Sequence, residues 1–206
     1  MKKNFSLSAV AVVAALSSTQ AFADKNDGTP HHIRGKSIRI IGGEPATENQ
    51  FPYMTSLQSG GSHFCGASFL GGKWVLTAAH CVNGFTGPNN GGLEVVIGGL
   101  DLTDDTSGTR VEVKNIYSHR DYNTPVEINN DMALLELTES VDLPSINILD
   151  QVSAEALAAG TSLTVSGWGN TSTEGHEFPD KLMFVDVPLV SNETCNAEDA
   201  YNGSIT

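Results

Sequence analysis

Short segments rich in β-branched, aromatic or alternating apolar residues recur along the middle of the chain. Turn-forming residues separate them, as in Gly71–Gly72, Asn89–Gly92 and Asp104–Gly108. Regular short strands between such turns are typical of an all-β barrel or sandwich. Only two short segments favour helix, Ser153–Ala159 and Asn192–Tyr201. The predicted strands are Phe51–Leu57, Phe64–Leu70, Trp74–Thr77, Leu93–Ile97, Val111–Tyr117, Met132–Leu137 and Ser162–Val165.

The first residues have the pattern of a secretory signal peptide. Met1-Lys2-Lys3 is a positive start, Leu7–Leu16 is an apolar run too short to span a bilayer, and Ala21-Phe22-Ala23 is a small-x-small cleavage signature. No later stretch is apolar for long enough to anchor the chain. We therefore predict a signal peptide over residues 1–23, a secreted protein, and no membrane association after signal removal.

Charge excludes one large class of partner. The 206-residue chain has a formal net charge of −13. Nucleic-acid binding surfaces are usually basic, because they neutralise phosphates. The balance therefore argues against nucleic acid as a partner and fits a soluble exported protein.

A polar leader, residues 24–39, precedes the first ordered segment. It ends at Arg39, and Ile40-Ile41-Gly42-Gly43 follows. Proteolysis concentrates in exposed flexible segments. Cutting after Arg39 would create an α-amino group on Ile40, which a pocket could accept if a carboxylate paired with it. The alternative is an ordinary linker into the first strand.

The chain has three cysteines. In an exported protein, Cys65 and Cys81 are expected to form a disulfide. The alternative is a zinc site formed by His63, Cys65, His80 and Cys81, although thiolate zinc sites usually show tighter paired spacing. Cys195 is left without a partner in the sequence.

Two further side chains are candidates for proton-transfer chemistry. His80 follows the apolar strand Trp74–Thr77 and two small alanines, which would hold its ring in a fixed position. A histidine titrates near neutral pH and can take and return a proton. Asp131 directly precedes an apolar strand, where a partly buried carboxylate needs a hydrogen-bond donor such as an imidazole N–H. Taken singly, a satisfied core histidine and a turn aspartate are the commoner roles.

Together these residues resemble the trypsin-like serine proteases of the chymotrypsin family. The resemblance runs from Ile40 to Thr206, and the histidine and aspartate signatures are its most specific parts. It rests on Ile40–Gly43, His63–Gly66, Thr77–Cys81, Asn130–Leu135, Gly167–Gly169 and Pro188–Cys195.

The resemblance implies a trypsin-like protease domain over residues 40–206, with a fold of two six-stranded antiparallel β-barrels. The first barrel is expected over roughly 51–150, and the second from roughly 158. It implies that His80 is the general base and Asp131 its orienting partner. It also implies activation by a protease that cuts after Arg39, protein or peptide substrates, and no cofactor.

The sequence also departs from the family's pattern. No Gly-Asp-Ser-Gly-Gly nucleophile motif occurs in the chain, and Ser204 lies in the wrong context to replace it. We expect a chain truncated before that motif, with an incomplete second barrel. Some relatives bind calcium in a loop whose first and last glutamate positions correspond to Gly99 and Thr109 here. We therefore predict no metal site and interpret the aspartates of this loop, Asp101, Asp104 and Asp105, as a solvated group.

Three functions are compatible with these features. The first is a secreted serine endopeptidase zymogen with a His-Asp-Ser triad whose serine is missing from this chain. The second is a non-catalytic binding protein with the protease fold, which would have little need for both His80 and Asp131. The third is an exported β-sandwich adhesion module, which gives neither residue a role.

Overall fold

The computed structural model describes residues 40–125, 127 and 129–197. The predicted signal peptide, the leader with Arg39, and Ser204 lie outside the described residues. Most of the described regular structure is β-strand, and its helices are short. No described helix has the length and apolar character needed to cross a membrane.

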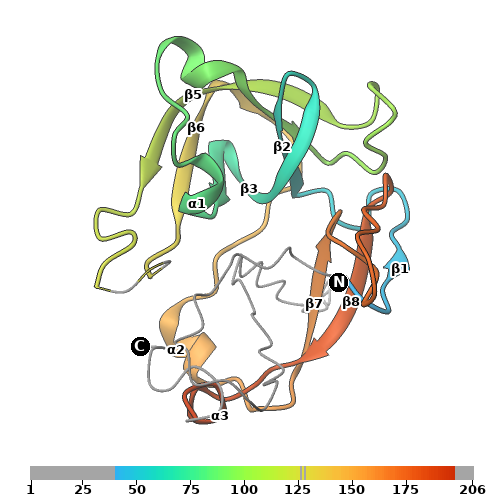
Figure 1. The fold of residues 1–206 in the computed structure, drawn as a ribbon, viewed down its shortest axis with the longest axis vertical. Helices are drawn as coiled ribbons and strands as arrows, with labels where there is room; N and C mark the ends of the chain where they lie inside the picture. The colour runs from blue at the N-terminus through green and yellow to red at the C-terminus, as the bar shows by residue number, and fades with distance from the viewer. Residues whose placement is uncertain (1–39, 126, 128, 198–206) are drawn as a thin grey trace, which may run out of the picture.

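Five strands form a closed barrel in the order β2-β3-β6-β5-β4, and β4 closes it by pairing with β2 (Figure 1). Alternating apolar side chains of these strands fill its interior, among them Leu57, Phe69, Val95 and Leu135. This arrangement confirms the predicted all-β barrel. The strands are β2 (Met54–Ser59), β3 (Ser62–Thr77), β4 (Leu93–Ile97), β5 (Thr109–Ser118) and β6 (Ala133–Val141).

Strand β3 corrects one detail of the sequence prediction. Gly71 and Gly72 were predicted to be a turn between two strands, but they lie inside one strand of 16 residues. Both have positive φ, at 103° and 59°, a region that glycine enters without steric cost. The register shifts between Gly72 and Trp74. The first part of β3 pairs with β2 and the last part with β6, so one bent strand replaces the two that were predicted.

A second, smaller sheet contains β1 (Glu44–Pro45), β8 (Met183–Pro188) and β7 (Ser162–Gly167), in that order. Figure 1 shows it beside the barrel, in orange-red and blue. Its described core is a small cluster of Ala46, Met54, Trp168 and Leu182. Three described strands agree with an incomplete second barrel, and the proposed boundaries of the two barrels stay predictions.

The helices are α1 (Ala79–Val82), the 3₁₀ segment η1 (Pro88–Gly92), α2 (Gln151–Glu155) and α3 (Asn192–Cys195). Both helical predictions were placed correctly but extended too far. The Asp150 side chain accepts a hydrogen bond from the Ser153 backbone and so starts α2 before the predicted residue.

Candidate active site

His80 lies in α1, directly after strand β3 ends. Ala78 and Ala79 are buried against the barrel core, at 1% and 0% exposure. Their small side chains let α1 begin close to the barrel wall, and the imidazole then projects outward. The His80 side chain is 44% exposed, so a substrate could reach the ring.

Asp131 comes from the other side of the same barrel edge. Strand β6 pairs with β3 so that Ala133 lies opposite Thr77, which brings the residues before β6 next to those after β3. The Oδ2 atom of Asp131 is 2.6 Å from Nδ1 of His80. Its Oδ1 atom accepts the His80 backbone N–H at 2.8 Å. The register of two strands therefore produces the contact that the sequence led us to expect.

This double contact determines which nitrogen of His80 is available. A carboxylate only accepts hydrogen bonds, so Nδ1 carries the proton that points at Asp131. The other nitrogen, Nε2, keeps its lone pair and faces away from the carboxylate. No hydroxyl group of the described residues forms a hydrogen bond with Nε2. The site therefore contains an oriented base.

The predicted disulfide between Cys65 and Cys81 is present, with its Cα atoms 6.2 Å apart. It links α1 to β3 and so fixes the helix that carries His80. The Cys81 sulfur lies 3.4 Å from Nε2 of His80. Free Cys195 lies at the end of α3.

The disulfide rules out the alternative zinc site. Cys65, His80 and Cys81 do lie within 4.8 Å of one another, but both sulfurs are bonded to each other and neither is a thiolate. His63 does not join them. Its Nδ1 atom pairs with the Ser56 hydroxyl at 2.8 Å, and burial lowers the pKa of His63 to about 4.

Ile40 lies at the edge of the smaller sheet and is completely buried. Its backbone N–H donates to the Asn170 carbonyl at 2.7 Å. The sequence argument expected a pocket for Ile40 with a carboxylate partner, but the partner in the described residues is this carbonyl. The structure does not test the predicted cleavage, because Arg39 lies outside the described residues.

Sequence reasoning missed Asn170. It is 0% exposed, and its side chain holds the loop that follows it. The amide Nδ2 donates to Gly175, and Oδ1 accepts from the backbone of Ser172 and Glu177. The only signal was its position after the Gly167–Gly169 motif, because a loop asparagine has no periodic pattern.

The family model for trypsin matches residues 40–206. The chain is 34% identical over 169 residues to Trypsin I-P1 of Gallus gallus, a match that covers 82% of this chain and 64% of that protein. It is 38% identical over 171 residues to Trypsin Tyr p 3.0101 of Tyrophagus putrescentiae, covering 81% and 56% respectively.

Solved structures give the same result. The VesB protease of Vibrio cholerae has a TM-score of 0.66 and 37% identity, and the match covers 77% of this chain and 47% of that one. The secreted serine protease VesC of Vibrio cholerae has a TM-score of 0.67 and 35% identity, covering 79% and 35%. The chain thus spans less than two thirds of the length of these relatives. The matched residues include both His80 and Asp131, and the chain belongs to the trypsin family.

Proposed function

We propose that this protein is a secreted serine endopeptidase made as a zymogen. The observation that carries the proposal is the 2.6 Å contact between His80 Nδ1 and Asp131 Oδ2. It leaves Nε2 as a base on an exposed ring, in the arrangement that activates a serine hydroxyl. Family membership supports the same activity.

In the proposed mechanism, Nε2 of His80 takes the proton of a serine hydroxyl while the serine oxygen attacks the peptide carbonyl. The ring becomes an imidazolium, and Asp131 stabilises its charge through Nδ1–H. The same ring then returns the proton to the leaving amine. The serine would come from sequence outside these 206 residues, which contain no Gly-Asp-Ser-Gly-Gly motif.

Activation would follow cleavage after Arg39 by a protease that cuts after basic residues. Burial of Ile40 supports this step, because a chain end formed at that residue would already lie inside the fold. The signal-peptide pattern supports secretion, and two relatives by structure are proteases of a secreting bacterium, one of them titled as secreted. The proposed substrates are proteins or peptides.

The runner-up is a non-catalytic binding protein with the protease fold. The absence of the nucleophile motif from the 206 residues favours it. The two functions differ in one measurable property, which is a reactive serine in the natural secreted protein.

The test uses a serine-directed phosphonate on the natural protein, before and after treatment with trypsin. We expect stoichiometric labelling after treatment, and no labelling of a His80→Ala variant. An unlabelled, correctly folded natural protein would establish the binding function instead.

Two further variants test the details. Arg39→Gln is expected to prevent labelling after trypsin treatment, and equal labelling of mutant and wild type would exclude Arg39 as the activation site. Residues 1–206 alone are expected to show no labelling, because the motif serine and the oxyanion-hole donors are both missing. Labelling that disappears in His80→Ala would show that the nucleophile lies within these residues.

A further inference from the structure

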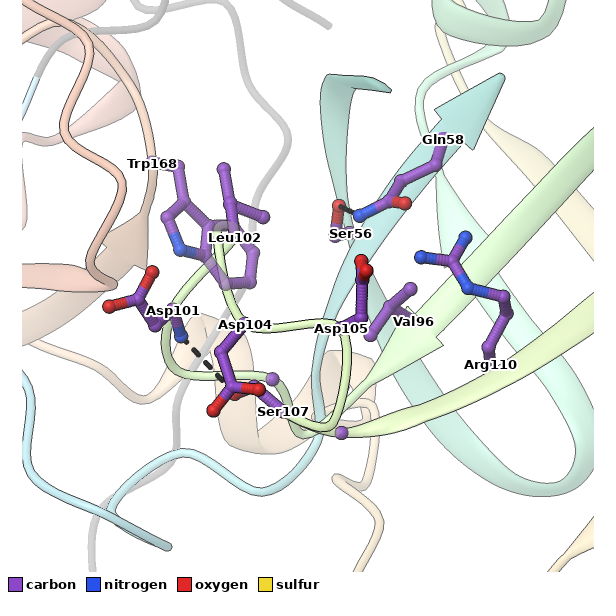
Figure 2. A pocket seen from close by; sticks show the side chains of 12 residues that line it. Ser56, Gln58, Val96, Asp101, Leu102, Asp104, Asp105, Ser107, Arg110 and Trp168 are labelled. Carbon is purple, nitrogen blue, oxygen red and sulfur yellow. Dashed lines mark hydrogen bonds between the residues drawn. The ribbon is translucent and has the colours of Figure 1, made fainter. Parts of the chain in front are cut away.

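A small pocket lies where the barrel meets the segment that follows β7, and Figure 2 shows it from close by. Strand β2 contributes Ser56 and Gln58, and Trp168 closes the opposite side. The loop between β4 and β5 supplies its acidic residues. Its volume is about 20 Å³, which is room for one water-sized group. Neither His80 nor Asp131 lines it.

Two buried polar atoms in this pocket have no hydrogen-bond partner. One is the acceptor Oε1 of Gln58, whose residue is 4% exposed. The other is the donor Nε1 of Trp168, whose residue is 2% exposed. Buried polar groups are nearly always paired in native proteins, so two unpaired ones in one pocket point to a ligand that supplies both partners.

The neighbours of Gln58 determine which of its atoms faces the pocket. Gln58 Nε2 donates to the Ser56 hydroxyl at 3.2 Å, and that hydroxyl pairs with His63 Nδ1 at 2.8 Å. A neutral His63 that accepts the Ser56 proton fits this chain of bonds. Oε1 is then left on the pocket side, where Figure 2 shows it near Asp105 and Arg110.

The loop that carries the acidic residues is held in place. The Leu102 N–H donates to the Asp180 carbonyl at 2.9 Å, and the Leu182 N–H donates to the Leu100 carbonyl at 2.7 Å. The Ser107 hydroxyl accepts the Leu100 N–H at 2.8 Å. The pocket wall is therefore fixed before any ligand arrives, which lowers the entropic cost of binding.

The charge at the pocket is negative. Hydrogen bonds from Thr103 and Thr106 lower the pKa of Asp101 and Asp104, so both carboxyls are ionised at neutral pH. Asp105 adds a third carboxylate to the lining. The pocket also contains Arg110, but its guanidinium is paired with Glu94 at 2.8 Å. The free charge thus favours a cation.

The geometry selects the kind of cation. A metal ion needs ligand atoms that converge, and among the described residues only Cys65, His80 and Cys81 have such spacing. A primary ammonium fits the single water-sized space and offers three N–H donors, whereas a guanidinium is broader. Trp168 Nε1 requires an acceptor in addition, which a peptide carbonyl provides.

We propose that this pocket binds the ammonium group of a lysine side chain in a polypeptide. Gln58 Oε1 and the Asp105 carboxylate accept its N–H groups, and Trp168 Nε1 donates to a backbone carbonyl of the same polypeptide. The site lies outside the catalytic pair, so it would hold a protein ligand by a second point of contact. It does not depend on the proposed protease activity.

The test follows the indole N–H resonance of Trp168 by NMR in a His80→Ala chain. The sequence has two tryptophans, and a Trp74→Phe variant assigns the signal. The probe is an acetylated, amidated Gly-Lys-Gly peptide, and the matched control replaces lysine by norleucine. We expect a saturable shift with the lysine peptide and none with norleucine.

Variants locate the contact. Asp105→Asn is expected to weaken binding roughly three-fold, as for a partly exposed charge pair. Gln58→Met should weaken it further, and Asp142→Asn, an exposed acid outside the pocket, should have no effect. Equal shifts with lysine and norleucine, or no shift, would overturn the proposal and leave the pocket to water. A shift produced by calcium alone but not by the lysine peptide would also overturn it.

Discussion

The barrel and the smaller sheet differ in how completely they bury their strands. Strand β2 of the barrel buries five of its six residues, whereas β8 of the smaller sheet buries none of its six. Both strands are paired on both sides, so hydrogen bonding does not explain the contrast. The difference is in the faces: a closed barrel covers its own interior, and a three-stranded sheet needs other elements to cover it.

This contrast explains how the candidate site is divided. His80 and Asp131 both extend from strands of the barrel, and their contact depends only on the register of β3 with β6. Ile40 and Asn170 meet at the smaller sheet. The base and its orienting partner are therefore positioned by the more completely packed region.

The largest expected effect tests whether the contact within the barrel carries catalysis. In the natural, activated protein, Asp131→Asn should lower kcat by about 10⁴-fold, the magnitude known for this exchange within the family and not one derived from this structure. The amide can donate to Nδ1, which then favours the wrong tautomer of His80. The measurement is peptide-ester hydrolysis by wild type and mutant.

The control is Asp142→Asn, which makes the same change at an exposed position without a printed contact to His80. Its activity should match wild type. A loss of less than tenfold in Asp131→Asn would contradict the role assigned to this carboxylate.

The next effect compares the cores of the two regions. Leu135 is completely buried in the barrel, and Leu135→Ala should lower the free energy of unfolding by about 2–5 kcal/mol. Leu163 of β7 is only partly buried, so Leu163→Ala should cost less than about 1.5 kcal/mol. Urea unfolding of both variants measures the difference. Equal losses would show that the two regions are packed to the same degree.

The sequence predicted those parts of the molecule that depend on local patterns. Alternating apolar residues located the barrel strands, and the segments around His80 and Asp131 identified the two side chains that meet. Neither segment alone distinguished this role from a core histidine and a turn aspartate. The pair became informative because both occurred in one chain with the same family pattern.

Other features depend on tertiary contacts that leave no local pattern. Gly71-Gly72 has the composition of a turn, yet β2 and β6 pair with the strand on either side of it and convert it to a bulge. The importance of Asn170 comes from backbone groups of the loop that it satisfies. Gln58 and Trp168 have unpaired atoms only because burial separates them from water.

Removing the disulfide tests how firmly α1 is attached to the barrel. The double variant Cys65→Ala/Cys81→Ala opens a loop with a sequence separation of 16. The expected loss is roughly 3 kcal/mol in the free energy of unfolding. Thermal unfolding of wild type under oxidising and reducing conditions should show the same difference, and reduction should not affect the double variant. An unchanged unfolding temperature would contradict a stabilising role.

The smallest effect concerns the junction of the two regions, where the His63 ring lies 5.3 Å from that of Trp168. Burial lowers the pKa of His63 from 6.5 to about 4. Between these values the unfolded chain binds a proton that the folded chain does not, so acid favours unfolding. His63 should thus lower stability by about 2 kcal/mol as pH falls from 6.5 to 4, after allowance for solvent screening.

His63→Gln keeps a polar side chain without this titration, and carboxylates contribute equally to both proteins. The difference in unfolding free energy between wild type and mutant should therefore change with pH over that window and be constant above it. Urea unfolding at several pH values measures this difference. A constant difference throughout would mean that His63 is accessible to protons in the folded state, and that the junction between barrel and sheet is more open than its burial indicates.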